Sequence, residues 1–412
     1  MRVAIISDLH FGFANTSERE EDSFIQGSEA IELALEGGAD LILIAGDVFD
    51  SRIPTQDVLA KAMEIFQEPL HAKSSDIKIL DSINKKRGEI AQAPFKGVPV
   101  IAIHGTHERR GRGLTNPLHV SEKAGLIVHL HCQTIVLELN GEKLAVHGFS
   151  GVPERYAKDV LEEWNPKAIE GATNIMLLHQ NIDEFLYTGT DFKSLELADM
   201  PKDFDLIVNG HIHWSCQAEL KQGGKFLIPG STIRTQLTKQ ESEIEKGIYF
   251  FENGELEFKK LESPRDFHYK TIETEEGTPS SIVSDIESVL KEIPKKDKRP
   301  LVKIILKGSL KKGYSKTDIF ITELGEKFKG DLILRIAKNQ LESKSVLDRT
   351  ELLSKNVGRA LSIEERGQEL LKMHLEGVNF VFGIAQDELL GILSEDSKEI
   401  ALKKIKEAIK IG

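Results

Sequence analysis

The feature that most restricts the fold of this chain is a series of short apolar runs, each ending close to an aspartate or a histidine. Runs of four to eight apolar residues bounded by turn residues are typical of buried strands. Five runs have this form: VAIIS (3–7), LILIAG (41–46), VPVIAI (98–103), TNIMLLH (173–179) and FDLIVNGH (204–211). The sequence therefore predicts a sheet structure in which polar side chains gather at the strand ends.

Helical and strand patterns alternate as far as about residue 265, with helices predicted near 18–36 and 55–67. This alternation predicts a layered α/β domain, 1–265, with two packed mixed sheets flanked by helices. A second set of strands and helices predicts a small α/β cap domain at 266–344, and a helical tail is expected at 345–412. The apolar stripes of the tail need a partner surface, either on the cap or on another protein, and both alternatives stay open.

Charge and composition limit the class of protein. A net charge of -12 gives no overall electrostatic case for nucleic-acid binding, so any such case must be local. Arg109, Arg110 and Arg112 are the local candidates for DNA contacts. No segment approaches the ~18 apolar residues that a membrane span needs, and no secretory signal is predicted, so we expect a cytoplasmic protein without membrane contact.

Polar residues follow the predicted strands at the ends where parallel α/β sheets bind ligands. These residues are Asp8, His10, Asp47, Asp50, Thr106, His107, His179, His211 and His213. Imidazoles mixed with carboxylates, without thiolates, suit divalent manganese, iron or zinc. Two ions ~3.5–4 Å apart, bridged by one carboxylate, would use the whole set and would activate a water for attack on a phosphate ester.

The order of these motifs resembles that of the calcineurin-like metallophosphoesterase superfamily. The motifs are DLH (8–10), GDVFD (46–50), GTHE (105–108), LLHQ (177–180) and GHIH (210–213). Further segments resemble the DNA double-strand break repair nucleases of that superfamily, whose bacterial counterpart is the SbcD exonuclease subunit. These segments are GDVFDSRIPT, ERRGRG and PGST (229–232), together with the predicted cap. The resemblance is strong over 1–265, moderate over the cap and weak over the tail.

The resemblance implies two divalent metal ions, of which Mn²⁺ is the expected kind, and a role for each motif residue. Asp8, His10 and His213 would hold one ion, His179, His211 and Thr106 the other, and Asp47 would bridge the two. His107 would lie over the scissile phosphate, as the catalytic residue that stabilises its charge or protonates the leaving oxygen. Family members usually have asparagine where this chain has Thr106, and some have histidine where it has Asp50.

The resemblance also implies a function and partners. The chain would be a manganese-dependent DNA nuclease that degrades from 3′ ends and cuts single strands or hairpins. It would act with a coiled-coil ABC-type ATPase, to which the tail would bind, and would form a homodimer through the helix near 55–67, unless that helix only covers the core. Two alternatives remain: a phosphodiesterase or phosphatase for other phosphate esters, and a scaffold that binds DNA and the ATPase through a weakened metal site.

Overall fold

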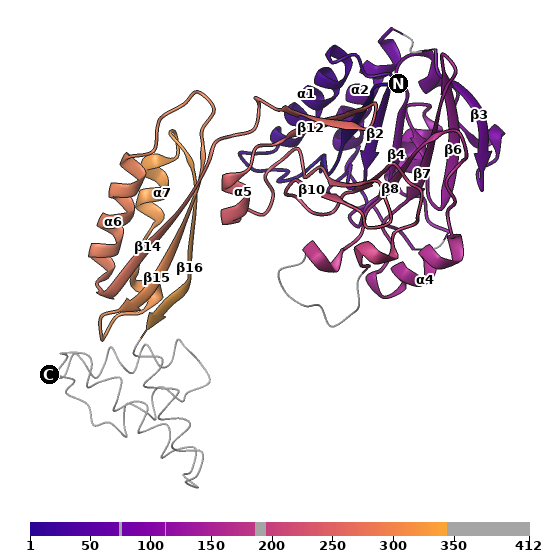
Figure 1. The fold of residues 1–412 in the computed structure, drawn as a ribbon. Coiled ribbons are helices and arrows are strands. Elements are labelled where there is room, and N and C mark those ends of the chain that lie inside the picture. The colour runs from indigo at the N-terminus through magenta and orange to yellow at the C-terminus, as the bar shows by residue number, and fades with distance from the viewer. Residues whose placement is uncertain (74–75, 112, 186–194, 344–412) are drawn as a thin grey trace, which may run out of the picture. The chain divides into compact units, whose positions relative to one another are not determined.

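The computed structural model describes residues 1–73, 76–111, 113–185 and 195–343 (Figure 1). The chain divides into two compact units, of which the first contains Met1–Tyr269 and Lys296–Val302. The second unit contains Lys270–Lys295 and resumes at Lys303. The predicted helical tail at 345–412 and Arg112 lie outside the described residues, and the roles assigned to the domains remain predictions.

The larger unit contains two sheets. One of them has six strands in the order β13-β12-β1-β2-β4-β5. Its strands are β1 (Val3–Ile6), β2 (Leu41–Ala45), β4 (Val100–Ile103), β5 (Val128–His129), β12 (Gly247–Glu252) and β13 (Glu255–Lys260). Neighbours from β1 to β5 are parallel, whereas β12 is antiparallel to both β1 and β13. The sheet is therefore mixed, as predicted, and the carboxyl ends of β1, β2 and β4 meet at one edge.

The other sheet of the larger unit has seven strands in the order β10-β11-β9-β8-β7-β6-β3. Its strands are β3 (Lys78–Ile83), β6 (Gln133–Leu139), β7 (Glu142–Phe149), β8 (Thr173–Leu178), β9 (Leu206–Asn209), β10 (Cys216–Glu219) and β11 (Lys225–Ile228). The neighbours β7, β8, β9 and β11 are parallel, and the remaining pairs are antiparallel. All five strands that the sequence predicts directly before polar motifs are thus present.

The two sheets pack face to face, because one cluster of buried apolar side chains takes alternate residues from both. In β1, Val3 and Ile5 belong to this inner cluster, and Ala4 and Ile6 belong to the cluster on the outer face. Successive side chains of a strand point to opposite faces. Continuous apolar runs therefore reflect strands that are buried on both sides.

Helices cover the outer faces of the two sheets (Figure 1). The helices of the larger unit are α1 (Asp22–Glu36), α2 (Gln56–His71), α3 (Pro117–Lys123), α4 (Glu154–Trp164) and α5 (Lys239–Glu243). The stripe of α2 that includes Val58, Ala62 and Phe66 is buried in the outer cluster of the six-stranded sheet. These apolar residues of the 55–67 segment thus cover the core, and a role of the helix in pairing remains a prediction.

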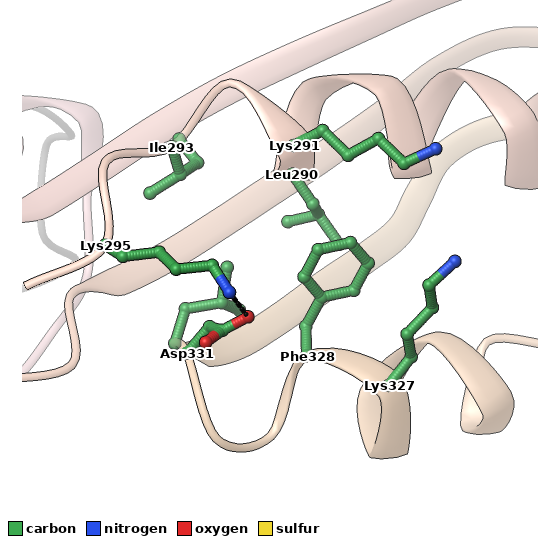
Figure 2. A pocket seen from close by; sticks show the side chains of 8 residues that line it. Leu290, Lys291, Ile293, Lys295, Lys327, Phe328 and Asp331 are labelled. Carbon is green, nitrogen blue, oxygen red and sulfur yellow. Dashed lines mark ion pairs between the residues drawn. The ribbon is translucent and has the colours of Figure 1, made fainter.

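The smaller unit contains a three-stranded sheet in the order β14-β15-β16. Its elements are β14 (Phe267–Gly277), α6 (Pro279–Lys291), β15 (Leu301–Leu310), α7 (Thr322–Phe328) and β16 (Ile333–Ser343). The first residues of β14 and β15 belong to the larger unit. Figure 2 shows a hollow between α6 and α7, in which Leu290 and Phe328 lie beside Lys295 and its ion-pair partner Asp331. None of the described helices in either unit has the length and apolar composition needed to cross a membrane.

Candidate metal centre

The loops that follow the strands of the larger unit hold the predicted ligands in an unusual backbone conformation. Asp8, His10, Asp47 and His211 have φ angles of 53°, 49°, 46° and 75°. Residues other than glycine rarely adopt this left-handed backbone conformation, and those that do are concentrated at functional sites. Each loop turns directly at the strand end, and the turn keeps the side chain at the edge of the sheet.

Two glycines allow these loops to approach one another closely. A Cβ atom at Gly105 would lie 2.1 Å from Asp47 Oδ1, and one at Gly46 would lie 2.3 Å from His179 Nδ1. Both positions therefore exclude any side chain. The glycines of the GDVFD and GTHE motifs are required by the packing of the motifs against each other.

The first group of potential ligands contains Asp8, His10 and His213, as the resemblance implied. The Nε2 atoms of His10 and His213 lie 3.2 Å apart, and Asp8 Oδ1 lies 4.0 Å and 3.7 Å from them, respectively. Two imidazole nitrogens bound to one tetrahedral ion at 2.0–2.1 Å are separated by about 3.3 Å. The two rings are therefore spaced as ligands of a common ion.

The second group contains Asp47, His179 and His211. His179 Nε2 is buried, has no hydrogen-bond partner among the described residues, and lies 3.2 Å from Asp47 Oδ2. Asp47 also forms a group with His10 and His107. The carboxylate of Asp47 thus lies within reach of both groups, in the position of a bridging ligand.

Hydrogen bonds donated by Nδ1 of His179 and His10 orient these rings and leave Nε2 available to a metal ion. His179 Nδ1 lies 2.8 Å from the carbonyl oxygen of Ala45, and His10 Nδ1 lies 3.1 Å from Asp50 Oδ1. Because these oxygens only accept, both rings carry the proton on Nδ1 when neutral. Metal-binding histidines are commonly fixed by such a bond from the other ring nitrogen.

The charges of the centre also suit a cation. Burial lowers the pKa of His179, but the charge of Asp47 and the short contact with it raise that pKa to about 10. In turn, burial raises the pKa of Asp47, and the opposing charge of His179 holds it well below its usual value. Without a metal ion, a proton on His179 therefore balances the buried carboxylate. A divalent cation supplies the same balance with more charge, and the residues present fit it.

Thr106 and His107 occupy the open side of the centre. Thr106 Oγ1 lies 3.5 Å from Asp47 Oδ2, and the backbone N–H of His107 donates to Asp47 Oδ1 at 2.9 Å. The His107 side chain is 42% exposed, with its Nδ1 hydrogen-bonded to the carbonyl oxygen of Asp50 and its Nε2 4.0 Å from Asp47 Oδ2. Its Nε2 thus has access to a substrate bound over the centre.

The arginines that were predicted to contact DNA come shortly after Thr106 and His107 in the sequence. Arg109 and Arg110 follow the GTHE loop and are partly exposed. Arg110 Nη1 donates to the carbonyl oxygen of Arg52, and burial lowers the pKa of Arg109. The arrangement joins the loop after β4 to the loop after β2, and contact with DNA remains a prediction for both arginines.

Several supporting residues were not predicted from the sequence. Lys246 is buried, and its Nζ donates to the carbonyl oxygen of His213 and to Ser231 Oγ, both at 2.8 Å, and to Glu241 at 3.2 Å. Burial lowers the pKa of Lys246 to about 8. Thr235 Oγ1 lies 2.6 Å from His213 Nδ1. The PGST motif, which contains Ser231, was the only sequence signal for this network.

Glu108 supports the other side of the centre. Its carboxylate accepts hydrogen bonds from the backbone N–H groups of Phe49 at 2.8 Å and Gly105 at 2.7 Å, and the side chain is fully buried. The contact joins the loop after β2 to the loop after β4. The GTHE motif, which ends with Glu108, was the sequence signal that could have identified this residue.

Comparison with known proteins finds one family model and several curated relatives. The family model described as "Calcineurin-like phosphoesterase" matches residues 1–215. A "DNA double-strand break repair protein Mre11" of Methanopyrus kandleri is 27% identical over 263 residues, which cover 60% of this chain and 52% of that protein. The protein of the same name from Sulfolobus acidocaldarius is 26% identical over 339 residues, covering 79% of this chain and 78% of that protein.

A relative from an animal shows a similar level of identity. "Double-strand break repair protein MRE11" of Mus musculus is 24% identical over 271 residues, covering 58% of this chain and 38% of that protein. The chain thus spans about half of the Methanopyrus kandleri relative and less of the mouse relative.

Proposed function

Because the chain belongs to the calcineurin-like phosphoesterase family, we propose that it is a two-metal DNA nuclease of double-strand break repair. The position of Asp47 carries the proposal, because it belongs to the second ligand group and also forms a group with His107 and with His10 of the first ligand group. The relatives named as double-strand break repair proteins support the choice of DNA as the substrate.

Two divalent ions held by these groups would lower the pKa of a water and polarise a phosphate ester. In the proposal, Asp8, His10 and His213 would hold the first ion, and His179 and His211 would hold the second. Asp47 would contribute to both, and Thr106 would face the second. Mn²⁺ is the proposed ion, because imidazole and carboxylate ligands suit it and the resemblance implies it.

The chain's own residues then orient and protonate the substrate. The hydrogen bond from His107 Nδ1 to the carbonyl oxygen of Asp50 turns the Nε2 edge of the ring towards the centre. A protonated Nε2 donates to the phosphate oxygen that leaves, which keeps that oxygen from departing with a full negative charge. Arg109, Arg110 and Arg112 would contact the phosphates of the DNA backbone next to the cleaved bond.

The proposed kinds of DNA cleavage, the cellular location and the partners rest on the resemblance to the repair nucleases. We propose 3′-to-5′ exonuclease activity and endonuclease activity on single strands and hairpins, in the cytoplasm. A coiled-coil ABC-type ATPase would bind the segment 345–412, and a second copy of this chain would form the homodimer.

The experiment is cleavage of end-labelled hairpin and duplex DNA by the purified chain, with and without Mn²⁺. A non-nucleotide phosphodiester is tested in parallel, and Asp47→Asn serves as the inactive control. The proposal expects manganese-dependent DNA products that Asp47→Asn does not give. Cleavage of the small diester alone would favour a phosphodiesterase for other esters, and absence of all cleavage would favour the scaffold.

A further inference from the structure

One histidine of the first metal position has a hydrogen-bond partner of a different kind from the others. His10 and His179 donate from Nδ1 to a carboxylate and to a backbone carbonyl oxygen, which can only accept. His213 Nδ1 instead lies 2.6 Å from the hydroxyl oxygen of Thr235. A hydroxyl group donates or accepts, and it rotates between the two roles. Of these three rings, His213 is therefore the one whose partner does not fix the position of the ring proton.

The contact between His213 and His10 gives this freedom a use. Their Nε2 atoms lie 3.2 Å apart, so without a metal ion one of the two nitrogens must carry a proton, because two bare acceptors repel each other. When His213 supplies that proton, its Nδ1 is bare and accepts from the Thr235 hydroxyl. When an ion binds, both Nε2 atoms must be bare, and neutral His213 then carries its proton on Nδ1 and donates to Thr235. In this exchange Nε2 loses one proton and Nδ1 gains one, so the charge of the ring is unchanged.

An acceptor-only partner at this position would not allow the exchange. A carboxylate would hold the proton of His213 on Nδ1, as Asp50 does for His10. Two neutral rings fixed in that way would leave the short contact between their Nε2 atoms without a donor. A hydroxyl satisfies the ring with and without the ion, and a buried polar group that stays paired in both forms avoids the cost of an unsatisfied one.

The segment that carries Thr235 is held in place by a buried carboxylate. The backbone N–H groups of Thr235 and of the next two residues donate to Glu241, at 3.2, 3.0 and 2.7 Å. Glu241 is buried and forms an ion pair with Lys246, whose Nζ also donates to the carbonyl oxygen of His213. The same network therefore fixes the backbone of the histidine and the backbone of its hydroxyl partner, and only the hydroxyl hydrogen needs to turn.

We propose that Thr235 is a positioning residue for the first metal ion. Its hydroxyl accepts from Nδ1 of His213 when the ion is bound, which leaves Nε2 bare and aimed at the ion. Without the ion the same hydroxyl turns and donates when the proton lies on Nε2. This role rests on the proposed two-metal centre, and Thr235 lies outside all the sequence motifs of that centre.

The first test is calorimetric titration of the full chain with Mn²⁺ in a His211→Gln background, which weakens the second position. Thr235→Val keeps the shape of the side chain and removes the hydroxyl. It is expected to weaken binding about 10- to 100-fold, the usual effect of losing such a supporting hydrogen bond. Thr235→Ser keeps the hydroxyl and is expected to restore the affinity of the background.

Thr232→Val is the matched control for the loss of a threonine hydroxyl in the same segment. Thr232 is fully buried, and its Oγ1 has no hydrogen-bond partner among the described residues. Its replacement therefore removes a buried hydroxyl without removing a hydrogen bond to a ligand. The Mn²⁺ affinity of Thr232→Val is expected to equal that of the background.

The second test needs no variant and so does not depend on the folding of Thr235→Val. Nitrogen NMR of the native chain loaded with Zn²⁺, a diamagnetic substitute for Mn²⁺, is expected to show His213 with a proton on Nδ1 that exchanges slowly with water. Fast exchange of that proton overturns the proposal, as does equal Mn²⁺ affinity of folded Thr235→Val and Thr232→Val. A native chain that binds no Mn²⁺ would overturn the metal centre and this role together, whereas Mn²⁺ binding without DNA cleavage would contradict only the nuclease activity.

Discussion

Replacing Thr106 with asparagine is expected to strengthen the second metal position. Two oxygen ligands on one octahedral ion at ~2.1 Å are about 3.0 Å apart. Thr106 Oγ1 lies 3.5 Å from Asp47 Oδ2, about 0.5 Å more than this spacing, and its short side chain cannot extend further, so direct ligation would need the strand end to move in. An asparagine carbonyl oxygen extends one bond further from the backbone and closes this gap.

The expected gain follows from the change of ligand. In this reasoning a water would fill the gap between the Thr106 hydroxyl and the ion, and the asparagine carbonyl would replace that water as a direct ligand. Changes to such supporting groups alter affinity by about 10- to 100-fold. We expect Thr106→Asn to tighten the second Mn²⁺ by at least the lower of these factors, which corresponds to about 1.4 kcal/mol. It also lowers the Mn²⁺ concentration needed for cleavage.

The assay is a stepwise Mn²⁺ titration by calorimetry of the native chain, Thr106→Asn and Thr106→Val. Valine keeps the shape of threonine and removes the hydroxyl, so it shows what that hydroxyl contributes. The reasoning predicts a weaker second step in the native chain, a tighter one with asparagine and a small change with valine. A large loss with valine and no gain with asparagine would show that Thr106 ligates the ion directly.

Other substitutions test the remaining parts of the account. His107→Ala is expected to abolish DNA cleavage while both Mn²⁺ ions still bind, and a lost ion in the titration would make His107 a ligand. Lys246→Met removes the donor to the carbonyl oxygen of His213 and the buried cation beside Glu241, whose carboxylate keeps its hydrogen bonds from backbone N–H groups. This change should cost about 1–3 kcal/mol in the free energy of unfolding, measured by urea denaturation; an unchanged midpoint would contradict this. Glu108→Gln places an amide against one backbone N–H and should cost about 1–3 kcal/mol by the same measurement. Deletion of 345–412 should leave Mn²⁺-dependent cleavage of single strands intact and remove ATPase binding, and failure of the shortened chain to fold would assign the tail to the core.

The local sequence was sufficient to predict the strands at the site. Each of the five apolar runs is buried on both faces, so its pattern is continuous, and the polar residue after it marks the point where the strand leaves the core. Parallel neighbours then bring Asp8, Asp47 and Thr106 to one edge without further information.

The supporting contacts depend on pairings that are distant in the sequence. Lys246 donates to the carbonyl oxygen of a residue 33 positions away, and His179 donates to one 134 positions away. Nothing in the local pattern around Lys246 distinguishes it from a solvated surface lysine. The left-handed backbone at Asp8 and His211 is likewise set by the packing of the loops, because local preference alone favours other conformations for these residues.

The central claim is that Asp47 joins two metal ions, and anomalous diffraction from crystals of the chain soaked in Mn²⁺ tests it most directly. The account predicts two anomalous peaks about 3.5–4 Å apart, one beside His10 and His213 and the other beside His179 and His211, with the Asp47 carboxylate between them. A single peak, or two peaks of which only one lies next to Asp47, would contradict it.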